Sequence, residues 1–247
     1  MRTAESPLAA TSRRYWSDKS DGMHRSSDEG AYANYAKELL ALLPVGGTLL
    51  DVGCGALQVT SYLAPHFARV IGFDRSESML AAAAARAERC GLSNVELRSG
   101  DAVSFPEGLP PADVVLSYGV VQYLSQDELG AHLRECRRAL ADGGIACSAI
   151  VPDSAQRSTY YYGRLVPAGP RLGGRLRSYV EVNRRRLKGR LAGNPLWDGM
   201  GNWFSVPQYE SIARQAGFDA EFRRCWFYDY RFHALLRPAA GEAGGRR

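Results

Sequence analysis

The strongest constraint on the fold of this chain is an apolar segment that runs directly into a glycine-rich turn. Leu49–Val52 is followed at once by Gly53-Cys54-Gly55, and a second apolar segment, Arg69–Asp74, ends in a carboxylate. Glycines let a backbone approach a ligand closely, and an acidic residue about twenty positions further on suits the two hydroxyls of a ribose. The pattern predicts a site for a nucleotide-like ligand at the first strand-to-helix turn of an α/β fold.

Strand and helix patterns alternate along most of the chain. The expected strands are Thr48–Val52, Arg69–Asp74, Asn94–Arg98, Ala112–Tyr118, Ile145–Val151, Ala220–Phe227 and Tyr230–Leu236. The expected helices are Gly30–Leu43, Ala56–Pro65, Ser76–Cys90, Ser125–Leu140 and Ser205–Ala216. Strands with few polar interruptions, separated by helices, are typical of a parallel sheet covered on both faces. Because only a short turn around Asp229 separates the last two strands, we expect them to pair antiparallel.

The fold class that follows is α/β, with a Rossmann-like, seven-stranded, mostly parallel sheet, an antiparallel C-terminal strand and helices on both faces. Residues 1–29 are polar without a sustained period and are expected to form a mobile N-terminal arm, and residues 30–237 the main domain. The Gly/Ala-rich residues 238–247 are expected to be a disordered tail. The regular pattern breaks at Pro152, so residues 153–204 are interpreted as a lid insertion.

The insertion is strongly basic. Between Arg157 and Arg190 it holds ten arginines or lysines, against the single acid Glu181. A solvated helix face explains such a tract, and the sharper hypothesis is a lid that meets an acidic or phosphate-bearing small molecule.

Bulk composition narrows the function classes. The net charge is +5, but only three of the 31 basic residues are lysines, so the arginine excess fits base composition as well as it fits a nucleic-acid partner, which is not favoured. Five scattered cysteines lack a Cys-x-x-Cys pair, which predicts no metal site. No apolar run approaches the roughly 20 residues that cross a bilayer, and the N-terminus lacks a secretory pattern, so a cytoplasmic protein without a membrane partner is expected.

Three spaced motifs resemble those of the class I methyltransferases that use S-adenosylmethionine, most closely over residues 30–151 and in outline over residues 205–237. They are the glycine turn, Asp74, and Gly100-Asp101-Ala102, followed by the segment after the fourth strand, Leu116–Leu124. The resemblance implies that these residues bind the cofactor S-adenosyl-L-methionine: Asp51, Gly53, Cys54, Gly55, Asp74, Arg75, Met79, Gly100, Asp101, Ala102, Ser117, Tyr118 and Gln122. The chain departs from the family at Leu57, where many members have a third glycine.

The resemblance further implies methyl transfer to oxygen or nitrogen of a small-molecule acceptor, such as a secondary metabolite or a sugar-like compound, acidic acceptors included. Candidate catalytic residues are Tyr123 after the fourth strand, Asp153 after the fifth, His233 and His24. Two other classes stay open: a cofactor-binding regulatory protein without catalysis, and a nicotinamide-dependent oxidoreductase. Gln58 stands where the third glycine of a dinucleotide motif belongs and argues against the latter. A homodimer is also left open.

Overall fold

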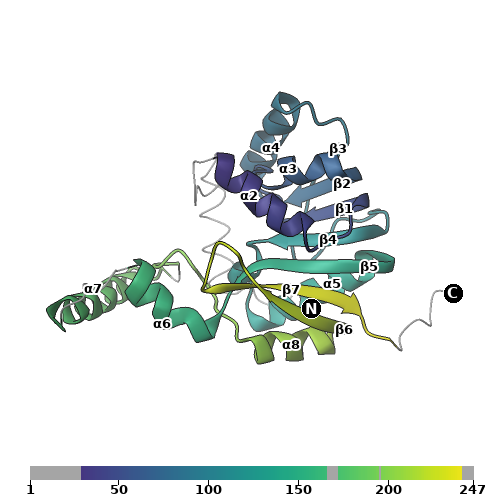
Figure 1. Ribbon diagram of the computed structural model, residues 1–247. Helices are drawn as coiled ribbons and strands as arrows, with labels where there is room; N and C mark the ends of the chain where they lie inside the picture. The colour runs from purple at the N-terminus through teal and green to yellow at the C-terminus, as the bar shows by residue number, and fades with distance from the viewer. Residues whose placement is uncertain (1–28, 166–171, 195, 241–247) are drawn as a thin grey trace.

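A single seven-stranded sheet forms the centre of the computed structural model, which describes residues 29–165, 172–194 and 196–240 (Figure 1). The strand order is β3-β2-β1-β4-β5-β7-β6, and only β7 runs antiparallel to its neighbours β5 and β6. The strands are β1 (Gly46–Val52), β2 (Phe67–Asp74), β3 (Val95–Ser99), β4 (Ala112–Tyr118), β5 (Leu140–Pro152), β6 (Phe218–Arg224) and β7 (Arg231–Pro238). The predicted fold class, including the antiparallel closing strand, is confirmed.

Helices cover both faces of this sheet, as expected for buried parallel strands. The principal helices are α2 (Glu29–Leu40), α3 (Thr60–Leu63), α4 (Glu77–Arg89), α5 (Gln126–Ala139), α7 (Leu172–Leu191) and α8 (Val206–Gln215). Apolar side chains of α5 and α8 share one core with Leu50 and Val52 of β1, whereas those of α2 and α3 share a second core with Leu49. Alternate residues of one strand therefore face two different helical layers.

Serine side chains cap the starts of three helices. Ser125 accepts a hydrogen bond from the backbone N–H of Glu128, whose side chain returns one to the Ser125 N–H, which completes a capping box at the start of α5. Ser76 and Ser205 cap α4 and α8 in the same manner through their side chains. These serines fix where each helix leaves the strand-end edge of the sheet.

The largest differences from the predicted element boundaries occur at two places. The expected helix Ala56–Pro65 is reduced to α3 and a 3-10 turn, Ala64–His66, because Leu57 holds a left-handed backbone with φ of 57°. β5 begins at Leu140 rather than Ile145, because Leu140 already pairs with Ala112 before a register shift in the β4–β5 ladder. β5 is therefore longer than the apolar run that predicted it.

The insertion projects away from the sheet. Its short helix α6 (Arg157–Thr159) leads toward α7, which extends from the body on the side away from α4 and β3 (Figure 1). The chain then returns along the loop after β4, where the Asn202 N–H donates to the Gln122 carbonyl at 2.7 Å and the Asn202 side chain donates to the Leu124 carbonyl at 2.6 Å. Within the described ranges, no helix is both long and apolar enough to cross a membrane. The expected arm and tail fall almost wholly outside those ranges.

Candidate functional site

A large cavity opens where the parallel strands end. It has a volume of about 1320 Å³ and lies at the carboxyl ends of β1, β2 and β4. Since β1 lies between β2 and β4, this edge is the point at which the strand order reverses, where open α/β sheets bind ligands. Helices α2, α5 and α8 contribute further lining residues.

The glycine turn after β1 is fastened to the end of β2. The backbone N–H groups of Gly53 and Cys54 donate to the Phe73 carbonyl at 2.8 and 3.1 Å. Gly53 and Gly55 both have left-handed φ angles, 67° and 52°, and a Cβ atom on Gly53 would lie 2.7 Å from Cγ2 of Val120. A side chain at Gly53 would therefore collide with the loop after β4, so this turn needs glycine.

Leu57 has a left-handed backbone conformation, which glycine adopts more readily than leucine. Its φ of 57° costs a leucine roughly 1–2 kcal/mol. The side chain is fully buried beside Cys54 and Ala83, which offsets that cost by about 1.5–3 kcal/mol. Burial of the Leu57 side chain thus compensates for its left-handed backbone.

Asp74 ties the same turn to the end of β2. One carboxylate oxygen accepts from the Gly55 N–H at 3.0 Å and the other from the Ser76 N–H at 2.9 Å. Burial raises the pKa of Asp74, although these backbone donors oppose the shift. A carboxylate has about four acceptor positions, so these backbone donors leave acceptor capacity for a ligand's hydroxyl group.

Asp51 is a buried carboxylate at the end of β1. The Thr60 hydroxyl donates to it at 2.6 Å. Burial is the main reason that the pKa of Asp51 rises to about 7; the Thr60 hydrogen bond opposes the rise and the charge of Asp74 adds to it. A buried carboxylate that opens into a cavity is stabilised by a cationic ligand group, which the ammonium of an amino-acid moiety would supply.

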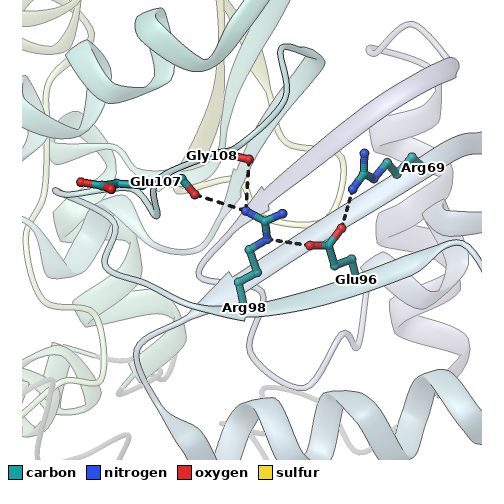
Figure 2. Close-up of polar contacts among 5 residues, drawn as sticks. All are labelled: Arg69, Glu96, Arg98, Glu107 and Gly108. Carbon is teal, nitrogen blue, oxygen red and sulfur yellow. Dashed lines mark hydrogen bonds and ion pairs between the residues drawn. The ribbon is translucent and has the colours of Figure 1, made fainter.

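The loop after β3 is held in place from two sides. Figure 2 shows Arg98 of β3 donating to the carbonyls of Glu107 and Gly108, at 3.3 and 3.4 Å. Glu96 bridges Arg98 and Arg69 of β2, each at 2.6 Å, and both hydrogen bonds lower the pKa of Glu96. This exposed network fixes the far end of the loop that carries Asp101 into the cavity.

His132 of α5 holds the near end of that loop and was missed as a site residue. Burial lowers its pKa to about 4, so the ring is neutral near pH 7. Its Nδ1–H donates to the Ala102 carbonyl at 2.7 Å, which leaves Nε2 to accept from the Ser117 hydroxyl at 2.9 Å. The spacing of Leu129, His132, Leu133 and Cys136 on one apolar helix face was the available signal.

Ser117 therefore does not lie where the sequence predicted it. It was expected to contact the cofactor, but its side chain is buried behind the strand and engaged by His132, and it does not line the cavity. The other cofactor-site candidates do line the cavity: Asp51, Gly53, Cys54, Gly55, Asp74, Arg75, Met79, Gly100, Asp101, Ala102, Tyr118 and Gln122.

Of the four candidate catalytic residues, the structure brings one to the cavity. Tyr123 lines it, and His24 lies outside the described residues. Asp153 is turned instead toward a depression of about 160 Å³ beside β6, where its side chain accepts from the Ala155 N–H. His233 does not line the cavity either, because both of its ring nitrogens are engaged inside the protein.

His233 belongs to a buried network centred on Glu38 of α2. The Glu38 carboxylate accepts from His233 Nε2 at 3.0 Å, from the Trp226 N–H at 2.5 Å and from the Cys225 thiol at 3.5 Å. The other nitrogen, Nδ1 of His233, accepts from the Ile150 N–H at 3.4 Å. These hydrogen bonds make the Glu38, Cys225 and His233 group an anchor that joins α2 to the β6–β7 connection and to β7.

Ile150 and Gln122, which both line the cavity, are fixed by β7. Ile150 has a left-handed φ of 54°, and the Arg231 guanidinium donates to its carbonyl at 2.5 Å while His233 accepts from its N–H. Arg231 also donates to the Gln122 side-chain oxygen at 3.1 Å. The antiparallel closing strand thus sets the shape of the wall around the loop after β4.

Tyrosines enclose one end of the cavity. Tyr35 of α2, Tyr118 of β4 and Tyr228 all line it, and the Tyr35 and Tyr228 hydroxyls are 2.7 Å apart. The Tyr35 ring lies 6.4 Å from that of Tyr118 and 5.3 Å from that of Phe227, between centroids. Sequence reasoning missed Tyr35 and Tyr228, because a separation of 193 positions leaves no local signal that they meet.

Comparisons with known proteins agree with this geometry. Residues 49–144 match the model of a methyltransferase domain. The ubiquinone biosynthesis O-methyltransferase of Cereibacter sphaeroides is 35% identical over 120 residues, which cover 48% of this chain and 47% of that protein. Trans-aconitate 2-methyltransferase of Variovorax paradoxus is 34% identical over 137 residues, 54% of this chain and 50% of that protein. The chain spans about half the length of the curated relatives it matches.

Solved structures extend the likeness in fold over almost the whole chain. The complex of DhpI with SAH has a TM-score of 0.65 at 18% identity, covering 96% of this chain and 100% of that one. DesVI of Streptomyces venezuelae has a TM-score of 0.60 at 20% identity, with the same coverage of 96% and 100%. The domain match identifies residues 49–144 as a methyltransferase domain, and the sheet order and the solved structures show that the chain has the Rossmann-like fold of S-adenosylmethionine-dependent methyltransferases.

Proposed function

We propose that this chain transfers the methyl group of S-adenosylmethionine to an oxygen of a small, planar, uncharged acceptor that binds against the tyrosines. The observation that carries the proposal is the convergence of Asp51, Asp74 and Asp101 from three neighbouring strand ends on one cavity, beside a glycine turn that leaves room for a ligand. Each carboxylate suits a different polar part of the cofactor.

The residues present fit such a cofactor. Asp51 lies where an ammonium group would stabilise its charge, and Asp74 keeps acceptor positions for ribose hydroxyls. Asp101 accepts from the Val103 N–H at 3.0 Å and retains its second oxygen for an exocyclic amine. The volume of about 1320 Å³ leaves space for a second small molecule beside the cofactor.

When bound, S-adenosylmethionine supplies a methyl group on a positively charged sulfur, so the transfer is a direct in-line displacement. The protein then has to align the acceptor and exclude water, effects worth roughly 7–11 kcal/mol in favourable intramolecular models. Tyr35, Tyr118 and Tyr228 form aromatic walls that attract a cation by about 0.5–2 kcal/mol. The paired hydroxyls of Tyr35 and Tyr228 can hydrogen-bond to an acceptor hydroxyl group.

The charged residues that line the cavity favour an uncharged acceptor over an anionic one. The charged residues that line the cavity are five acids and two arginines: Asp51, Asp74, Asp101, Asp127, Glu128, Arg75 and Arg134. The tyrosine end holds neither arginine on its own elements, α2, β4 and the β6–β7 connection. A tricarboxylate such as trans-aconitate would therefore find no arginine among the lining residues at the tyrosine end, whereas an uncharged phenol would meet aromatic walls.

Titration calorimetry with S-adenosylhomocysteine and with NADH tests the cofactor. We expect S-adenosylhomocysteine to bind and NADH not to bind; binding of NADH alone would overturn the proposal. Asp74→Asn should weaken S-adenosylhomocysteine binding by about a hundredfold, since two charge-assisted hydrogen bonds are lost. Glu77→Gln, an exposed acid three positions further on, is the matched control and should bind like the parent protein.

Turnover tests the acceptor. With labelled methyl donor, we expect methylation of catechol as the planar, uncharged probe and none of trans-aconitate. The reverse result would assign an anionic acceptor. Tight binding of S-adenosylhomocysteine without turnover of phenols, amines or carboxylates would instead support the regulatory alternative.

A further inference from the structure

Helix α7 exposes large apolar side chains that a protein normally buries. Their exposed fractions are 66% for Leu176, 58% for Tyr179, 56% for Val180, 58% for Leu187 and 80% for Leu191. At about 100° of rotation per residue, Leu176, Val180, Leu187 and Leu191 fall within roughly 60° of one another around the helix axis. Leu176, Val180, Leu187 and Leu191 form one stripe along the helix, here called the α7 stripe.

The stripe does not face the body of the protein. Ser178, Val182 and Gly189, on the opposite side of α7, are the buried positions. Gly189 packs so closely that a Cβ atom there would lie 2.3 Å from Cβ of Trp197. α7 projects from the sheet (Figure 1). Because its opposite face is already packed, the exposed stripe is turned away from the packed face.

Cations flank the stripe on both sides. α7 carries seven basic residues and the single acid Glu181, whose carboxylate accepts from Arg184 and Arg185 at 2.8 and 2.9 Å. The same rotation per residue puts Arg177, Arg184 and Lys188 along one edge of the stripe. It puts Arg175, Arg186 and Arg190 along the other, and all six are exposed. Their long side chains can cover apolar surface while the charged ends reach outward.

We propose that α7 docks on an anionic lipid surface, with the apolar stripe at the level of the headgroups and the flanking cations on lipid phosphates. An exposed apolar stripe between basic edges, on a helix about 30 Å long, has the composition of an interfacial helix rather than of a spanning one. A second copy of this chain is a poor occupant, because pairing two α7 stripes would bring cationic edges against cationic edges. The surface is separate from the cavity, since none of the described residues of α7 lines it.

Vesicle flotation tests the proposal on the full chain. We expect the protein to float with vesicles of phosphatidylcholine mixed with phosphatidylglycerol, and to stay unbound with phosphatidylcholine alone. Binding should weaken as salt is raised, because surface charges are screened. Equal binding to both vesicle types, or binding to neither, would overturn the proposal.

Two sets of variants separate the apolar and charged contributions. Val180→Ser with Leu187→Ser should abolish flotation, whereas Val45→Ser, an equally exposed apolar residue outside α7, should not change it. Replacing Arg186, Lys188 and Arg190 by glutamine should weaken binding about a hundredfold. Replacing three exposed arginines elsewhere, Arg138, Arg214 and Arg223, removes the same charge and should leave binding close to that of the parent.

The remaining outcomes are also decisive. All variants should keep the circular dichroism and the unfolding midpoint of the parent, because the replaced side chains are exposed. If size-exclusion chromatography shows a dimer that Val180→Ser with Leu187→Ser dissociates, the stripe is an interface between copies and the lipid proposal is wrong. S-adenosylhomocysteine binding, measured on the same samples, reports separately on the proposed methyl transfer.

Discussion

Helix α2 lines the cavity and the described part of the insertion does not, although the composition of the insertion is the one that predicts a lid. Of the described residues between 153 and 204, none lines the cavity, whereas Tyr32 and Tyr35 of α2 and Tyr228 of the β6–β7 connection do. The insertion is the basic, aromatic segment that looks like a lid, and α2 is an ordinary amphipathic helix. Topology decides the difference: α2 and the β6–β7 connection lie beside the strand ends, and α7 extends away from them (Figure 1).

α2 is held over the cavity at both ends, by two anchors of unequal burial. At its start, Glu29 forms a two-point ion pair with Arg86 of α4 at 2.9 and 3.0 Å, and the Glu29 side chain is half exposed. Near its end, Glu38 is buried with three donors from the β6–β7 connection and β7. The buried anchor should matter more, because water cannot replace the lost partners there.

The largest expected effect comes from removing the buried anchor. Glu38→Ala leaves His233, Cys225 and the Trp226 N–H without their acceptor and should lower the free energy of unfolding by about 3–5 kcal/mol. Glu29→Ala, the matched change at the exposed end, should cost at most about 1 kcal/mol. Urea denaturation measures both, and Glu38→Gln serves where Glu38→Ala fails to fold. Equal losses at the two ends would contradict the unequal roles of the anchors.

A second test compares the two candidate covers through acceptor kinetics. Tyr35→Ala removes an aromatic wall and should lower kcat/KM for catechol by about tenfold to a hundredfold, mainly through KM. Replacing Arg184, Arg185 and Arg186 together by glutamine should leave kcat/KM unchanged, since α7 lies outside the cavity. Tyr35→Phe, which keeps the ring and loses the Tyr228 hydrogen bond, separates shape from hydrogen bonding. A large KM effect of the arginine replacement alone would restore the insertion as the lid.

A third test measures how the pKa of Asp51 affects ligand binding in the cavity. Its pKa is raised to about 7 by burial, and a bound ammonium group would lower it again. S-adenosylhomocysteine affinity should therefore level off above pH 7 and fall by up to about tenfold per unit as the pH drops below 7, with proton release on binding. Calorimetry in two buffers of different ionisation enthalpy measures this release, and Asp51→Asn should abolish it.

The pH dependence of S-adenosylhomocysteine affinity also distinguishes helix α2 from the insertion. Loosening α2 by Glu38→Gln should admit water to Asp51 and move the midpoint of the pH dependence below 7. Glutamine replacements on α7 should leave the midpoint in place. A midpoint that moves with the α7 charges instead would place the insertion close to the cofactor end of the cavity.

The sequence predicted those parts of the site that are short motifs of neighbouring residues at strand ends. The glycine turn, Asp74 and Asp101 each follow a strand directly, so the strand order alone brings them to one edge. Tyr35, Tyr228, Glu38 and His233 come together across almost the whole chain length, and no spacing rule relates them. Asp153 shows the converse error: it follows β5 as expected, but it turns to the far side because it caps the next turn.

Leu57 shows a departure from a family pattern that the sequence could not resolve. Residue type alone left the details of the turn open, and only the backbone shows that φ is left-handed while the side chain fills a core. The left-handed backbone destabilises the turn when leucine occupies position 57, and burial of the leucine side chain stabilises it. The relative sizes of these two free energies therefore decide whether leucine is tolerated there.

The smallest expected effect concerns the glycine turn after β1, where the side chain of Leu57 packs beside Cys54 and Ala83. Leu57→Ala and Leu57→Gly both empty the same buried space, but only glycine relieves the left-handed backbone, so Leu57→Gly should be the more stable of the two by about 1 kcal/mol. This reverses the usual order of alanine and glycine, as Ala83→Gly in the neighbouring helix α4 should show. Urea denaturation of the three variants measures the difference. Greater stability of Leu57→Ala would mean that the backbone of the turn relaxes when the side chain at position 57 is shortened.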